Sequence, residues 1–145
     1  MDTKTILLVE DDPDDEQLIL MSLKQSNISN AIMVAHDGQE ALDLLFGTEA
    51  QRGLGPLCLP VVVLLDLHLP KIDGLEVLQR IRADERTKLL PVVILTSSIE
   101  EQDRLDGYNR GANSYVCKPV DFGEFAKTVK ALGLYWALLN KSARD

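Results

Sequence analysis

The sequence alternates between short apolar runs and longer segments with helical spacing, and this alternation most constrains the fold. We expect the apolar runs to form strands over residues 5–9, 31–35, 61–65, 92–95 and 114–117. Most of them consist of valine, isoleucine and leucine, which is typical of parallel strands buried on both faces. Strands that alternate with helices indicate an α/β fold, in which a parallel sheet is covered by helices on both faces.

Helices are expected between and after these strands, over residues 14–25, 38–46, 74–84, 99–108 and 121–139. Pro13 suits the first turn of the first helix, and Asp12 suits its N-cap. We expect a doubly wound, flavodoxin-like sheet of five parallel strands in the order 2-1-3-4-5. In such a sheet, ligands bind beyond the carboxyl ends of the strands, at the switch point between the first and third strands.

Length and charge exclude several kinds of protein. With 145 residues, 46% of them hydrophobic, the chain is long enough for one domain with an ordinary core. A net charge of −8 argues against nucleic acid as a partner, because phosphate binding needs clustered lysine and arginine. We find no signal-peptide pattern and no run near about 18 apolar residues, so we expect a cytoplasmic protein without a membrane segment. Cys58 and Cys117 show no CxxC spacing and are expected to be reduced.

Polar residues that can take part in chemistry follow several of the predicted strands. Asp66 ends the third strand, and Glu10 and Asp11 follow the first strand within a group of acidic residues. Thr96 follows the fourth strand, and Lys118 follows the fifth. Because the carboxyl ends of parallel strands meet at one edge of a sheet, we expect these residues to form one site.

This combination of residues permits metal-assisted phosphoryl transfer. Carboxylates crowded into one space repel each other unless a cation intervenes, and Mg²⁺ prefers oxygen ligands, including phosphate oxygens. A carboxylate can also be the nucleophile and form an aspartyl phosphate. In such a transfer, Mg²⁺ and Lys118 would neutralise the phosphate oxygens, and the Thr96 hydroxyl would donate a hydrogen bond to one of them.

At these positions the chain resembles the receiver domain of two-component response regulators (the CheY-like family). The resemblance rests on four motifs in order, namely residues 9–13 (VEDDP), 64–70 (LLDLHLP) with Asp73 and Gly74, 95–97 (LTS) and 115–119 (YVCKP). It covers residues 4–132. The resemblance therefore implies a single receiver domain over residues 1–145, in which residues 133–145 extend the last helix.

The resemblance implies a role for each of these residues. Asp66 would be the phosphoacceptor. The residues that would bind Mg²⁺ are Glu10, Asp11, Asp66 and, through its backbone carbonyl, His68. Lys118 would bind the phosphoryl group, Thr96 would be the switch hydroxyl, and Tyr115 would be the switch aromatic residue.

Some details are similar to single-domain regulators of bacterial and cyanobacterial phytochromes. These details are the long loop over residues 47–60, residues 69–74 (LPKIDG), residues 95–98 (LTSS) and the pair Tyr135 and Trp136. The likeness implies a sensor histidine kinase, a bacteriophytochrome, as the phosphoryl donor. The output would be protein contact after a conformational change, or relay to a histidine phosphotransfer protein. Such a protein is no enzyme beyond its own phosphorylation and dephosphorylation.

The C-terminal residues carry more apolar surface than one helix stripe can bury. They include Leu134, Tyr135, Trp136 and Leu138. Exposed apolar and aromatic patches mark partner sites, so we expect a homodimer contact here. The alternative is a long last helix that packs all of these side chains onto the sheet.

Two other functions are compatible with an aspartate at a strand end. Phosphohydrolases that form an aspartyl phosphate typically carry a second aspartate two positions later, where this chain has His68. A receiver that is no longer phosphorylated could serve as an interaction module. The complete set of Glu10, Asp11, Asp66, Thr96 and Lys118 argues against that alternative.

Overall fold

The protein contains a five-stranded parallel sheet in the order β2-β1-β3-β4-β5. The computed structural model describes residues 5–25, 31–47, 59–96, 111–112 and 114–117. The strands are β1 (Ile6–Val9), β2 (Ile32–Ala35), β3 (Val62–Leu65), β4 (Val92–Thr96) and β5 (Ser114–Cys117). This order confirms the predicted fold class.

The register of the strands places the switch point at the carboxyl ends of β1 and β3. Val9, the last residue of β1, pairs with Ala35 on one side and with Leu65 on the other. The chain moves from β1 outward to β2 and then crosses to β3 on the opposite side of β1. The residues that follow Val9 and Leu65 therefore leave the sheet next to each other, which is where ligands bind in open α/β sheets.

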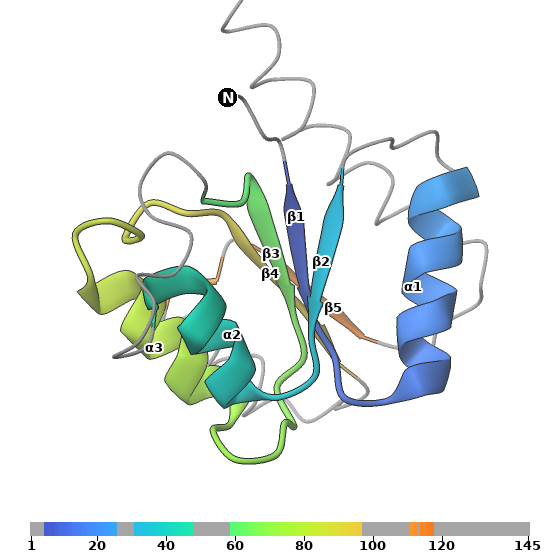
Figure 1. The fold of residues 1–145 in the computed structure, drawn as a ribbon, viewed down its shortest axis with the longest axis horizontal. Helices are drawn as coiled ribbons and strands as arrows, with labels where there is room; N and C mark the ends of the chain where they lie inside the picture. Colours follow the sequence, from blue (N-terminus) through green and yellow to red (C-terminus); the bar gives the residue numbers. More distant parts are fainter. Residues whose placement is uncertain (1–4, 26–30, 48–58, 97–110, 113, 118–145) are drawn as a thin grey trace, which may run out of the picture.

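Helices cover both faces of the sheet. Figure 1 shows α2 (Gly38–Phe46) and α3 (Gly74–Ala83) on one face and α1 (Pro13–Gln25) on the other. Successive residues of a strand point to opposite faces, so each strand contributes to two cores. The core under α2 and α3 includes Leu7, Val9, Val63, Leu65, Leu42, Leu45, Val77, Leu78 and Ile81. The core under α1 includes Ile6, Leu8, Val62, Leu64, Ile19 and Leu23.

An aspartate directly precedes each described helix and accepts a hydrogen bond from a backbone amide of that helix. Asp12 accepts from the Asp14 amide at 2.8 Å at the start of α1. Asp37 accepts from the Glu40 amide at 2.7 Å before α2. Asp73 accepts from the Leu75 amide at 2.8 Å before α3. Caps of this kind satisfy amides that have no partner inside the helix, and they determine the residue at which each helix begins after the sheet edge. The predicted roles of Asp12 and Pro13 are confirmed.

The observed elements agree with the predicted ranges to within one residue at each end. The ranges 38–46 and 114–117 match, whereas α3 ends at Ala83 because Asp84 has extended backbone angles. The helices expected over residues 99–108 and 121–139 lie outside the described residues. Among the described residues, we find no helix with both the length and the apolar character that crossing a bilayer requires.

Candidate functional site

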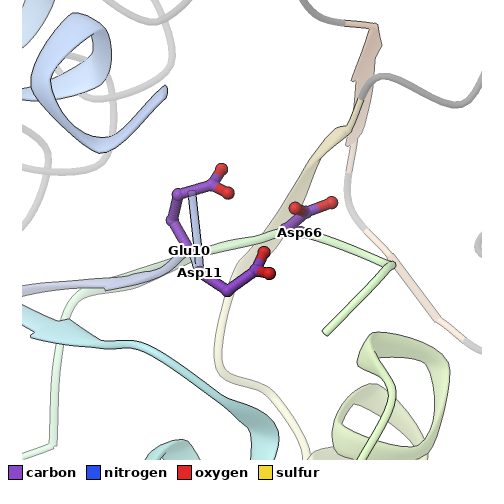
Figure 2. A group of neighbouring side chains, drawn as sticks. All are labelled: Glu10, Asp11 and Asp66. Carbon is purple, nitrogen blue, oxygen red and sulfur yellow. The ribbon is translucent and has the colours of Figure 1, made fainter. Parts of the chain in front are cut away.

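Three carboxylates meet at the carboxyl edge of the sheet, beside β1 and β3. Glu10, Asp11 and Asp66 each offer an oxygen, and these oxygens all lie within 4.8 Å of one another. Figure 2 shows the side chains on two neighbouring segments, with the carboxylates of Asp11 and Asp66 directed toward the same space. Glu10 and Asp66 are 1% and 7% exposed, whereas Asp11 is open to solvent. The structure thus brings together the acidic residues that the sequence predicted to be neighbours.

The position of Asp66 is set by backbone contacts on both sides. The Asp66 amide donates to the Val9 carbonyl at 3.0 Å, which continues the pairing of β3 with β1 by one residue. The His68 amide donates to Asp66 Oδ1 at 3.3 Å. These contacts hold the carboxylate at the rim of the sheet while it stays mostly buried.

Glu10 and Asp12 follow β1 and have different roles in the structure. The Glu10 amide donates to the Ala35 carbonyl at 2.9 Å, and Glu10 Oε2 accepts from the Asp12 amide at 3.1 Å. Asp12 is exposed and caps α1. The metal-ligand cluster contains Glu10 and Asp11 but not Asp12.

The donor set fits a hard divalent cation. Three carboxylates this close together repel one another, and a cation removes that repulsion. Hard cations take oxygen ligands, and Mg²⁺ needs only one or two carboxylates because waters and phosphate oxygens complete its shell. Glu10, Asp11 and Asp66 supply such oxygens within 4.8 Å of each other. The exposed position of Asp11 leaves a side of the cluster accessible to a phosphate group.

Thr96 and Tyr115 lie on strands at the other side of β3. Thr96 is the last residue of β4 and pairs with Cys117 of β5. Tyr115 pairs with Ile94, which itself pairs with Leu65 of β3. The backbone of Thr96 is therefore at the same edge as Asp66, and Lys118 follows directly after β5. The side chains of Thr96 and Tyr115, all of Lys118, and the predicted dimer residues Leu134, Tyr135, Trp136 and Leu138 lie outside the described part of the chain.

The turn before α2 contacts the segment that follows Asp66, which the sequence does not predict. Asp37 pairs with Lys71 at 3.4 Å between Oδ2 and Nζ. The hydrogen bond from the Glu40 amide lowers the pKa of Asp37, and the charge of Lys71 also lowers it, while burial opposes both. Gly38 lies under the loop that follows Asp66. The Asp-Gly dipeptide is a signal for a turn or a cap, but it does not say which segment packs against that turn.

Comparisons with known proteins agree with this geometry. The model of the response regulator receiver domain matches residues 6–130. The chain is 40% identical to the probable methanogenesis regulatory protein FilR2 of Methanothrix harundinacea, over 94% of this chain and 86% of that protein. The structure of the bacteriophytochrome response regulator AtBRR is similar, with 47% identity, a TM-score of 0.75 and coverage of 94% and 96% of the two chains.

The Mn²⁺-bound form of response regulator Rcp1 is a further structural relative. It has 35% identity and a TM-score of 0.80, and the match covers 92% of this chain and 94% of that one. The family match spans most of the chain, and the acidic cluster is the kind of site at which receivers hold a divalent metal. The chain therefore belongs to the response regulator receiver family, the signalling domains of two-component systems that accept a phosphoryl group and work with a histidine kinase.

Proposed function

We propose that Asp66 is the residue that accepts the phosphoryl group and that Mg²⁺ is the metal of this receiver. The observation that carries the proposal is the convergence of Glu10, Asp11 and Asp66 within 4.8 Å at the switch point of the sheet. Asp66 directly follows β3, where its amide donates to the Val9 carbonyl, and its carboxylate lies beside those of Glu10 and Asp11. The proposed metal ligands are Glu10, Asp11, Asp66 and the backbone carbonyl of His68.

The reaction is a transfer between two nucleophiles. An Asp66 carboxylate oxygen attacks the phosphorus of a phosphohistidine, the phosphorus–nitrogen bond breaks, and the imidazole nitrogen keeps the electron pair and takes up a proton. Mg²⁺, when bound, supplies charge neutralisation for the phosphoryl oxygens. Lys118 and the Thr96 hydroxyl would contact the same oxygens. The position of Thr96 at the end of β4, and of Lys118 directly after the neighbouring β5, supports these roles.

The same proposal covers the output of the domain. In our proposal the chain is one receiver domain with a core over residues 4–132 and a C-terminal extension over 133–145. Thr96 and Tyr115 report phosphorylation to the surface around β5, and Leu134, Tyr135, Trp136 and Leu138 form a homodimer contact. A bacteriophytochrome kinase in the cytoplasm is the proposed donor, supported by the 47% identity to a bacteriophytochrome response regulator. A histidine phosphotransfer protein is the proposed acceptor where the signal is relayed.

The decisive experiment is intact-mass spectrometry after incubation with acetyl phosphate, with and without Mg²⁺. We expect one phosphoryl adduct that requires Mg²⁺ and is absent from Asp66→Asn. Asp12→Asn is the matched control, because it removes a neighbouring carboxylate at the same edge while asparagine still caps α1. An adduct that persists in Asp66→Asn would refute the assignment of Asp66. No adduct in the wild type under any condition would instead favour a receiver that acts only as an interaction module.

A further inference from the structure

The two ends of the loop that follows Asp66 are joined by a backbone hydrogen bond. We call residues 67–73 the acceptor loop. The amide of Gly74, the first residue of α3, donates to the Leu67 carbonyl at 2.8 Å. Near the start of the loop, the His68 amide donates to Asp66 Oδ1 at 3.3 Å. The two ends of the acceptor loop are therefore tied to each other and to the candidate phosphoacceptor.

The tip of the acceptor loop has an uncommon backbone conformation. Lys71 has a φ of 68°, and it is the only non-glycine residue with a positive φ in the part of the chain that the structure describes. The Ile72 amide donates to the Pro70 carbonyl at 2.8 Å across this residue. Non-glycine residues rarely adopt positive φ, and they keep it only where surrounding contacts impose it.

Those surrounding contacts come from the turn before α2, which lies beside the acceptor loop (Figure 1). The Gly38 amide donates to the Pro70 carbonyl at 3.4 Å, and Asp37 Oδ2 lies 3.4 Å from Lys71 Nζ. A Cβ on Gly38 would lie 1.9 Å from the Ile72 carbonyl oxygen, so only glycine permits this approach. Asp37 uses its other oxygen, Oδ1, to cap α2, and thus links the helix and the loop tip.

We infer that Asp37, Gly38 and Lys71 form a clamp that positions the acceptor loop and thereby sets the affinity of the site for its divalent cation. The inference rests on the proposed function, because it takes Asp66 and the His68 carbonyl as metal ligands. None of the three clamp residues belongs to the acidic cluster, so they are positioning residues. Residues that orient metal ligands from outside the coordination shell influence affinity strongly, and losing them typically costs about 10- to 100-fold.

Three substitutions separate the parts of the clamp. Lys71→Met removes the ammonium group and leaves the cap of α2 intact. Lys71→Arg keeps a cation at the same position and serves as the rescue variant. Gly38→Ala places a methyl group against the Ile72 carbonyl and forces the loop tip away from α2. Lys88→Met is the matched control, since it removes another exposed lysine, whose ion pair with Glu85 is formed outside the clamp.

The experiment titrates the full-length chain with MgCl₂ alone and follows the backbone amide signals of Asp66 and His68 by NMR. The dissociation constant for Mg²⁺ is expected to rise about two- to three-fold in Lys71→Met, the range for one partly exposed ion pair. It is expected to rise about 10-fold in Gly38→Ala and to stay at the wild-type value in Lys71→Arg and Lys88→Met. The free energy of unfolding, measured in EDTA, shows that each variant is folded during the titration.

The outcomes distinguish the clamp from the proposed function. If the wild type binds Mg²⁺ and Lys71→Met binds it equally well, the clamp is wrong while the metal site stands. If Lys71→Arg is weakened as much as Lys71→Met, the ion pair is not what positions the loop, and the clamp is also wrong. If the wild type does not bind Mg²⁺, both the proposed metal site and the clamp fail. Where Gly38→Ala does not fold, the Lys71 pair decides the question.

Discussion

Gly74 packs against the backbone of Asp66 so closely that a Cβ on Gly74 would lie 2.2 Å from the Asp66 carbonyl oxygen. It would also lie 2.6 Å from the Leu67 Cα, so the backbone of Asp66 and Leu67 leaves no room for a side chain. The first residue of α3 is therefore in close contact with the backbone of the candidate phosphoacceptor.

The first prediction follows from this contact. Gly74→Ala is expected to lower the free energy of unfolding by about 1–3 kcal/mol, because the methyl group must displace backbone atoms. Helix propensity alone predicts the opposite sign, a gain of about 1 kcal/mol when alanine replaces glycine in a helix. Urea denaturation measures the change directly. A more stable variant would show that the Asp66 backbone can move aside without cost.

The second prediction concerns repulsion within the acidic cluster. Asp11→Asn removes one of three carboxylates that lie within 4.8 Å of each other, so the protein without divalent cation is expected to become more stable. Wild-type protein is expected to gain about 2.7 kcal/mol when Mg²⁺ is present at 100 times its dissociation constant. The variant should gain much less at the same concentration. Thermal unfolding in EDTA and in MgCl₂ measures both effects, and an equal gain in the two proteins would exclude Asp11 as a ligand.

The third prediction concerns the cap of α2. Asp37→Ala is expected to cost about 1 kcal/mol of stability at neutral pH, whereas Asp37→Asn should cost less because asparagine also caps helices. The folded pKa of Asp37 lies below its ordinary value of 3.8, chiefly because its carboxylate accepts a hydrogen bond from the Glu40 amide.

A depressed folded pKa determines the direction of the pH dependence. The unfolded state binds the proton first as the pH falls, so the contribution of ionised Asp37 is complete above about pH 3.8 and is lost as the pH falls through the lowered pKa. Urea denaturation of wild type and Asp37→Asn between about pH 6 and pH 3 measures this. We expect the stability advantage of the wild type to shrink toward the acidic end, and a constant difference would contradict the assignment.

The fourth prediction concerns Arg82, which ties α3 to the segments that lead into β4 and β5. Its guanidinium donates to the Gly111 carbonyl at 2.8 Å and to the Leu90 carbonyl at 2.7 Å. Arg82→Met is expected to lower the free energy of unfolding by about 2 kcal/mol, because hydrogen bonds from a charged donor to half-buried carbonyls are lost.

The matched control for Arg82 is Arg80→Met on the same helix. Arg80 pairs with Glu76 at 3.0 Å on the exposed surface, and such pairs contribute about 0.3–0.5 kcal/mol. Urea denaturation of the two variants side by side separates the buried contacts from the loss of a positive charge. Equal destabilisation by the two substitutions would show that the carbonyl contacts of Arg82 are not important for stability.

Strand positions and the acidic cluster could be predicted because each depends on local sequence. The apolar runs that became β1, β3 and β4 are continuous, and Glu10, Asp11 and Asp66 come directly after two of them. The start of α1 could also be predicted, since Asp12 and Pro13 form a local capping pattern that the structure confirms. The sequence predicts a helix over residues 74–84, whereas α3 ends at Ala83, because the terminal turn of a helix depends on weak local contacts.

The sequence by itself determined the fold class, the order of elements and the identity of the acidic residues at the sheet edge, because periodicity and strand ends are properties of neighbouring residues. The tertiary structure decided which backbones meet at close range. Asp37 and Gly38 contact Lys71 and Ile72 only because α2 and α3 pack on the same face of the sheet. This contact between the turn before α2 and the acceptor loop results from the packing of many side chains, so no local sequence pattern predicts it. It places Gly38 and the ion pair between Asp37 and Lys71 next to the loop that follows Asp66.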